Sequence, residues 1–501
     1  MRLELAPQER GKGYYLPPAC FTLTKLEKKI FCECLYGIKV PSGYCSNIKN
    51  YVSLKDHKLV GMKSHDCHIL MQHLLPVAIR GILPNHVRHA ITRLCFFFNA
   101  ISSKVIDPEK LDELQREVVV TLCQMEMYFP PSFFDIMVHL VVHLVREIKI
   151  CGPVFLHYMW PYERHMGYLK SKVKNRGRPE GSIIRGVIDE EVLEFCTPYL
   201  PNTDHLGLPK SRHEGRLQGV GTIGRNFLKN IEDELVAKAH LLVLQHLQIV
   251  HPYLIEHQKI LKSRNPLRTP EWLTQEHNRT FASWLKDLFF SKSSILSNDV
   301  GSELKWLAYG PKTPINSYEG YDINGYTFYT SRQDAKSVLQ NSGVTLVASS
   351  FDYSSASNNN PSQSQMSYYG RIEEIWELDY VEFKFGLFRC KWVDNRRGVR
   401  HDDMGFTLVD FSRCGYQNDP FILASQAEQV FYVEDCSDRK WSVVVPTGKK
   451  LVGHDEQVEL DELVDEMPSF SIGIPPVDVQ SDHGEDDLPF VSTHSEGLLI
   501  T

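Results

Sequence analysis

The stretch YYGRIEEIWEL, residues 368–378, is followed after a short connection by FGLFRCKWVD, residues 385–394. Both are rich in the aromatic and β-branched residues that favour strands. GFTLVDF at 405–411 and KWSVVVP at 440–446 repeat the pattern downstream, separated by polar turns. Several short strands at such spacing are typical of antiparallel β folds. We therefore expect a small, twisted β-barrel-like domain in this part of the chain.

The same strand-favouring pattern begins upstream, near residue 301. INGYTFYT at 323–330 contains an Asn-Gly pair, the strongest short signal for a tight hairpin turn, and GVTLVASS follows at 343–350. Residues 349–367 are dominated by Ser, Asn and Gln, so we expect a polar linker there. The predicted β-rich domain thus covers residues 301–450.

Before this domain the periodicity is helical. Apolar residues recur at three-to-four spacing, which predicts amphipathic helices, in the segments 68–83, 85–102, 107–129 and 133–148. Asp107 followed by proline is a helix-start signal. We expect a mixed segment at 1–62, a mostly helical domain at 63–200, and a connector at 201–300. The connector combines a basic loop with two helices, at about 226–263 and 270–292. The fold class is therefore α+β and multidomain.

Charge separates the tail from the rest of the chain. The net charge is −7, yet no Lys or Arg follows Lys450 and 13 of the 62 acidic residues do, so residues 1–450 carry 55 basic and 49 acidic groups. We expect a disordered acidic tail at 451–501. Twelve scattered cysteines fit reduced thiols. Neither a transmembrane run nor a secretory signal is expected, so we predict no membrane partner.

Two long blocks resemble domains of unknown function of plant CACTA (En/Spm)-type transposases. The first runs from MKSHDCHILMQHLLPVAIRGILP through FPPSFFDIMVHLVVHLVREIKICGPVFLHYMWPYERHMGYLK, over roughly residues 60–200. The second contains YYGRIEEIWELDY, FRCKWVDNRRGVR, GFTLVDF and DPFILASQAEQVFYVED, over roughly 320–445. The resemblance implies a plant nuclear protein derived from a cut-and-paste DNA transposon. It also implies that the helical domain is the helical part of an RNase H-like transposase.

Such transposases carry two catalytic aspartates upstream, and no strand-borne Asp pair of that kind is found in this sequence. We therefore expect a C-terminal portion of a transposase, with DNA-binding or assembly surfaces and an incomplete catalytic triad. One alternative is an active subunit, with two-metal phosphoryl transfer completed by upstream or partner sequence; magnesium is expected only in that case. Another alternative is a chromatin-binding module. Expected partners are double-stranded DNA, full-length transposase and chromatin proteins.

The segment WPYERHMGYLKSKVKNRGRP, residues 160–179, carries the candidate DNA-contacting chemistry. By the resemblance, Glu163 is a relic of the third catalytic acid; alternatively, it only complements the dipole of a helix start. The cations that follow it are candidates for phosphate contact: Arg164, Lys170, Lys172, Lys174, Arg176 and Arg178. The RGRP tetrapeptide matches the centre of an AT-hook, although a helix end decorated with cations explains the same letters.

Two histidine pairs suggest a structural zinc site. His139 and His143 are four residues apart, so both rings can reach one metal from one helix face. His65 and His68 provide a second pair, in which Cys67 could replace either histidine. Related transposases pin a helical insertion with such a zinc. Packed or surface histidines on an amphipathic helix remain the open alternative.

Four aromatics of the β-rich domain, Trp376, Tyr380, Phe388 and Trp392, permit two interpretations. On an exposed face they would suit a cage for a methylated lysine, through cation–π attraction. Strand alternation places them equally well in the core, which is the interpretation we favour.

Overall fold

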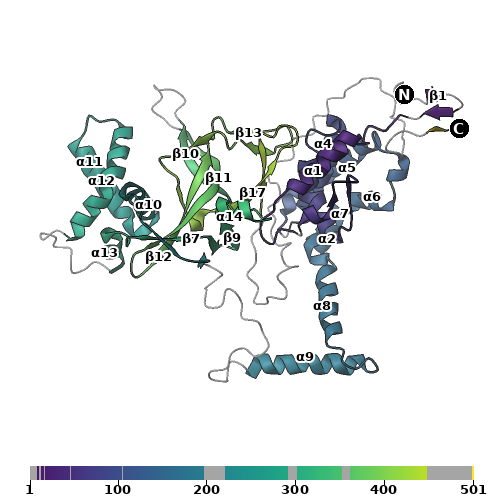
Figure 1. The fold of residues 1–501 in the computed structure, drawn as a ribbon, viewed down its shortest axis with the longest axis horizontal. Helices are drawn as coiled ribbons and strands as arrows, with labels where there is room; N and C mark the ends of the chain where they lie inside the picture. Colours follow the sequence, from purple (N-terminus) through teal and green to yellow (C-terminus); the bar gives the residue numbers. More distant parts are fainter. Residues whose placement is uncertain are drawn as a thin grey trace.

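The computed structural model describes residues 8–10, 13–15, 17–45, 47–103, 105–196, 221–290, 302–352, 362–447 and 499–500. Its fold is α+β, with a helical N-terminal part and a β-rich C-terminal part (Figure 1). No described helix is both long and apolar enough to cross a membrane. The predicted acidic tail and the basic loop of the connector fall almost entirely outside these residues.

The N-terminal part contains most of the helices that periodicity predicts. Its α-helices are α1 Lys25–Gly37, α2 Ser64–Ile69, α3 Leu75–Ala78, α4 Asn85–Ile101, α5 Leu111–Glu126, α6 Ile136–Leu140, α7 Leu144–Cys151, α8 Trp160–Ser171 and α9 Pro179–Cys196. A π-helical turn, Leu70–Leu74, separates α2 from α3, where Pro76 cannot donate to the helical ladder. A 3₁₀ turn, Val141–His143, similarly divides α6 from α7. The predicted segments at 68–83 and 133–148 are thus helical but interrupted.

Local capping fixes the ends of these helices. Thr24 and Glu27 form a complete capping box at the start of α1, in which the Glu27 amide donates to Thr24 Oγ1 at 3.2 Å. Asp107 caps the 3₁₀ turn Pro108–Lys110 that leads into α5, as its Asp-Pro signal predicted. Gly152, at a φ of 88°, ends α7 in a conformation that glycine adopts without strain.

The connector folds onto the β-rich part. It contributes β5 Gly221–Ile223, β6 Phe227–Lys229, α10 Asp233–His246, α11 His251–Arg264, α12 Pro270–Phe290 and, just beyond it, α13 Ser302–Tyr309. The single helix expected at 226–263 is therefore a strand and two helices. Leu247 is extended and ends the first helix. Pro252 lies in the first turn of α11, where its lack of an N–H suits a helix start.

The β-rich part is an open antiparallel sheet. Its elements are β7 Ile315–Tyr318, β8 Gly320–Ile323, β9 Tyr326–Tyr329, α14 Ser331–Lys336, β10 Gly343–Asp352, β11 Ser362–Asp379, β12 Lys384–Val393, β13 Val399–His401, β14 Thr407–Val409, β15 Cys414–Gly415, β16 Phe421–Leu423, β17 Glu428–Glu434 and β18 Ser442–Pro446. The main path is β13-β14-β18-β17-β10-β11-β12-β15 within an 11-stranded sheet, and β8 and β9 pair with β5 in a separate three-stranded sheet. Small pairs β1 Gln8–Arg10 with β2 Gly13–Tyr15, and β3 Val52–Ser53 with β4 Lys58–Leu59, lie apart from it; β19 Leu499–Ile500 joins β2.

The expected barrel does not form, because the path is not closed on itself. The C-terminal half of the long strand β11 is instead buried on both faces. Trp376 packs with the connector helices, whereas its neighbour Ile375 packs with β8 and β9. A sheet whose two faces are both covered does not need closure to bury its apolar residues. The sequence pattern therefore predicted the strands correctly but their arrangement wrongly.

Two details of the sheet follow from turn chemistry. Asn324 and Gly325 join β8 to β9 with φ values of 53° and 76°, as a type I′ turn requires. Strands β10 and β11 pair from Gly343 opposite Arg371 to Asp352 opposite Ser362. Strand structure therefore extends into both ends of the polar segment expected at 349–367, whose centre, 353–361, lies outside the described residues.

Candidate nucleic-acid interface

Helices α8 and α9 form a projecting arm, which we define as residues 160–196. Figure 1 shows α8 extending away from the other helices and α9 lying crosswise at its far end. The two helices are joined by residues 172–178, and we call residues 170–178 the elbow. Contact between them is concentrated there: the Lys172 ammonium pairs with Glu190, and Tyr168 Oη donates to the same carboxylate at 2.5 Å.

The predicted phosphate-contacting cations gather at this elbow. Lys170, Lys174, Arg176 and Arg178 are exposed, and none forms an ion pair with a described residue. Lys172 differs, since it is mostly covered, pairs with Glu190 and lies 4.5 Å from the centre of the Tyr168 ring. The side chain of Arg164 lies outside the described part of the structure. Four accessible positive charges therefore lie within nine residues of chain, counted from 170 to 178.

The RGRP tetrapeptide is a compact turn. Asn175 Oδ1 accepts a hydrogen bond from the Gly177 amide at 2.9 Å, and the Arg178 amide donates to the Asn175 carbonyl at 3.2 Å. Pro179 then begins α9. This backbone presents Arg176 and Arg178 to solvent at a helix–turn–helix corner, whereas an AT-hook lies extended in the minor groove. The geometry favours contact with backbone phosphates.

Glu163 lies in the first turn of α8 and is exposed. Its amide donates to the Met159 carbonyl at 2.9 Å, so its backbone is ordinary helix. No group of three or more His, Cys, Asp or Glu side chains within the described residues is arranged to hold a metal ion. Glu163 therefore has no described set of partner carboxylates, and its catalytic role stays a prediction.

The histidine pairs are only partly assembled. His139 and His143 are exposed and share one face of the α6–α7 segment, with their Nε2 atoms 3.3 Å apart. His68 is half-buried beside Tyr158, and burial together with the charge of His65 lowers its pKa. Since no described group of three ligands exists, the pairs do not come together in that part of the chain. A bound zinc stays a prediction. Metal analysis tests it: the His139→Ala/His143→Ala variant should lose the zinc that the wild type holds.

The four candidate cage aromatics are core residues. Trp376 and Tyr380 pack against the connector helices, and Phe388 and Trp392 pack against β8 and β9. None is more than 5% exposed. A methyl-lysine cage needs accessible ring faces, so these residues cannot form one in this fold.

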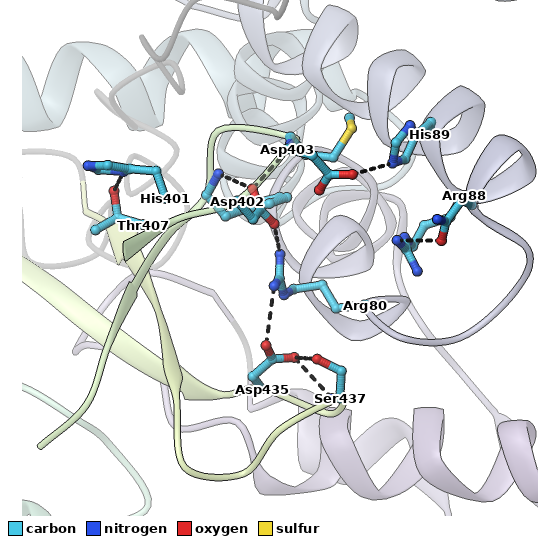
Figure 2. Close-up of polar contacts among 12 residues, drawn as sticks. Arg80, Arg88, His89, His401, Asp402, Asp403, Thr407, Asp435 and Ser437 are labelled. Carbon is cyan, nitrogen blue, oxygen red and sulfur yellow. Dashed lines mark hydrogen bonds and ion pairs between the residues drawn. The ribbon is translucent and has the colours of Figure 1, made fainter. Parts of the chain in front are cut away.

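A charged cluster that the sequence did not indicate joins the helical part to the sheet. Figure 2 shows Arg80, just after α3, between Asp402 and Asp435 from the β-rich part. The Arg80 Nη2 atom lies 3.2 Å from Asp435 Oδ2, and Nη1 pairs with Asp402. The two carboxylates raise the pKa of the guanidinium although its burial opposes this. His89 pairs with the neighbouring Asp403 at 3.1 Å.

Each carboxylate of this cluster is also held by its own loop. Asp402 accepts from the Met404 and Phe406 amides, and Asp435 accepts from the Ser437 amide and hydroxyl. In each aspartate the oxygen that does not face Arg80 thus accepts two hydrogen bonds from its own loop, which makes the cluster an ionic lock between the two parts. Its members are up to 355 residues apart, so no local spacing could have revealed it.

Two family models match this chain. Residues 101–213 match a domain of unknown function, DUF4218, and residues 376–444 match another, DUF4216. Both domains are typical of plant transposase-derived proteins. The first match contains the whole projecting arm, and the second runs from the end of β11 into β18. No curated protein and no solved structure matches the chain.

Proposed function

We propose that this chain is a transposon-derived nuclear protein, a portion of a CACTA-type transposase, whose function is to bind duplex DNA. The observation that carries the proposal is the elbow, where four exposed cations that pair with no described residue lie on a corner that projects from the fold. Two matched domains typical of transposase-derived proteins support the same conclusion.

The elbow suits phosphates better than base edges. Its cations are on long, flexible side chains around a short turn, and the described contacts hold the backbone rather than the charged groups. Cations of this kind neutralise phosphates and release counterions, which gives salt-dependent binding with little sequence preference.

The test is anisotropy of a labelled duplex titrated with the full chain at several salt concentrations. The variant Lys170→Gln/Lys174→Gln/Arg176→Gln/Arg178→Gln removes four charges from the elbow. A matched control, Lys55→Gln/Lys259→Gln/Lys262→Gln/Arg332→Gln, removes four exposed charges elsewhere. Each phosphate contact contributes about −0.9 to the slope of the logarithm of the binding constant against the logarithm of the salt concentration. The elbow variant should therefore reduce the magnitude of this slope by about two to four. Absence of binding at low salt, or equal losses in both variants, would refute the proposal.

A further inference from the structure

Two cysteines from distant parts of the chain meet at the joint that the ionic lock spans. Cys34 lies on α1, in the helical part, and Cys436 lies in the loop between β17 and β18 of the sheet. Their side chains form a hydrogen bond with each other. Both are free thiols, and both are partly exposed. The fold therefore places two reducing groups in direct contact, within reach of small molecules in solvent.

The surrounding contacts fix both sides of this thiol pair. Cys34 packs against the hydrophobic core to which α1, β17 and β18 contribute. In the loop, Asp435 is held by Arg80 at 3.2 Å (Figure 2). An added Cβ at Gly81 would come 2.6 Å from Ser437 Cβ, so the loop lies directly on the segment that follows α3. Packing and the ionic lock, rather than the thiols themselves, thus keep the two sulfur atoms together.

The two thiols differ in acidity. The hydrogen bond from Cys34, aided by the charge of Arg80, lowers the pKa of Cys436, although burial and the two preceding acids oppose this. The same hydrogen bond, together with burial, raises the pKa of Cys34. Cys436 is therefore the thiol that ionises first, and Cys34 is the donor beside it. The thiolate is the form of cysteine that reacts with oxidants.

Packing alone does not account for the pair. Cysteine often fills a core as a small apolar residue, and Cys32 and Cys95 do so, since each is 2% exposed and only burial raises its pKa. Cys34 and Cys436 instead contact each other and stay partly exposed. An accessible, more acidic cysteine beside a second cysteine is the arrangement of a redox-sensing pair.

We propose that Cys34 and Cys436 are a reversible redox switch, in which a hydroperoxide closes a disulfide across the joint. The Cys436 thiolate attacks one peroxide oxygen, the O–O bond breaks, and Cys436 becomes a sulfenic acid as hydroxide or alkoxide leaves. The Cys34 sulfur then attacks the sulfenic sulfur, the S–S bond forms, and water leaves with the Cys34 proton. The two cysteines give up two electrons, which the peroxide takes. A dithiol reductant returns them and is itself oxidised to a disulfide.

The disulfide joins α1 covalently to the loop that carries Asp435. It adds a second fastening beside the ionic lock, between the same two parts of the fold. A crosslink between residues far apart in the chain restricts the open and unfolded states strongly, so opening of the joint becomes rarer. In a reducing compartment such a bond is transient, and the lock alone then holds the joint.

Peptide mapping of the full chain tests the bond. Reduced protein is treated with hydrogen peroxide under conditions that oxidise glutathione, the remaining thiols are alkylated, and the digest is analysed by mass spectrometry without reduction. We expect peptides linked through Cys34 and Cys436, and their separation after dithiothreitol treatment of the folded protein. In Cys34→Ser, Cys436 should stop at the sulfenic acid and be trapped by dimedone. Recovery of both cysteines as free thiols in treated wild type, or a bond that dithiothreitol cannot reduce in the folded protein, would overturn the proposal.

Hydrogen exchange tests the consequence for the joint. Amides of β17 and β18 should exchange at least about tenfold more slowly in oxidised than in reduced wild type. Peroxide-treated Cys34→Ser should exchange like reduced wild type. The matched control is Cys414→Ser, at another partly exposed cysteine, whose thiol donates to the Phe411 carbonyl at 3.2 Å; it should keep the full response. Equal exchange in oxidised and reduced wild type, or a response that disappears in Cys414→Ser, would contradict the inference.

Discussion

Replacing Arg80 by alanine removes the cation between Asp402 and Asp435 and leaves both carboxylates at the joint between helices and sheet (Figure 2). Asp435 is fully buried and Asp402 is 16% exposed, so water replaces little of what is lost. Breaking one partner of a buried ion pair typically costs 3–5 kcal/mol. The loop amides and the Ser437 hydroxyl still bind the carboxylates, so we expect the lower end, about 3 kcal/mol.

Hydrogen exchange is the suitable assay, because a chain with several parts need not unfold in one step. Strands β17 and β18 flank the loop that holds Asp435 and contribute to the core shared with α1, α3 and α4. Amides there should exchange more than about a hundredfold faster in Arg80→Ala, the equivalent of 3 kcal/mol.

Arg88→Ala is the matched control. Arg88 is a nearby arginine, and its described side-chain bond is an exposed one to Asn85 at 2.9 Å. Its loss should change the local opening free energy by no more than about 0.5 kcal/mol. Arg80→Met combined with Asp435→Asn should cost less than Arg80→Met alone, since a buried charge is removed with its partner. Equal effects of Arg80→Ala and Arg88→Ala would refute the ionic lock.

Two further predictions concern packing and protonation. Gly343→Ala should destabilise the β10–β17 pairing by about 1–3 kcal/mol, because its Cβ would come 2.1 Å from the Val430 carbonyl oxygen; Gly37→Ala, with nothing within 4 Å, is the control in the same urea titration. Burial, together with the charge of His257, lowers the pKa of His277 from 6.5 to about 4. The Nδ1 atoms of the two rings are 2.8 Å apart. The unfolded chain then binds more protons than the fold, so stability should fall by up to about 3 kcal/mol between pH 6.5 and 4. A His277→Gln melting curve with unchanged pH dependence would contradict this assignment.

The strands and the Asn324-Gly325 turn were predictable because their signals are local. Alternation and turn chemistry act over a few residues, and the structure confirms them at β8, β9, β11 and β12. Closure of the sheet was not predictable in this way, since it depends on what covers each face. The connector helices that pack on Trp376 come from 86 to 143 residues upstream, and no signal in the sequence near Trp376 indicates them.

The candidate interface shows the same division. Charge patterning identified the cations of the elbow, but only the structure shows that they lie at a corner between two helices. The Asn175 side chain and Pro179 make that corner, and both are visible in the sequence as turn and helix-start residues. The acidic character of α9 was also visible in the sequence. That α9 lies crosswise at the far end of α8 was not, and only the structure shows it (Figure 1).

The substitution Glu163→Gln tests whether Glu163 is a helix-start residue or a ligand of a cation. An acid in the first turn of α8 stabilises the helix by about 0.3–1 kcal/mol through the macrodipole. Glu163→Gln should therefore speed amide exchange in α8 by about two- to fivefold. Glu191→Gln, at an exposed acid in the C-terminal half of α9, should not speed exchange there, because an acid gains nothing from that end of the dipole.

DNA affinity should rise slightly in Glu163→Gln, because a negative charge near the cations of α8 is removed. A loss of amide protection in α8 far beyond tenfold would contradict the helix-start role. So would weaker DNA binding by Glu163→Gln if added magnesium strengthens binding by the wild type and not by the variant. Either result would instead favour a carboxylate that holds a cation against the phosphates. The exposed setting of Glu163, with an ordinary helical backbone and without a described set of partner carboxylates, makes the small dipole effect the expected outcome.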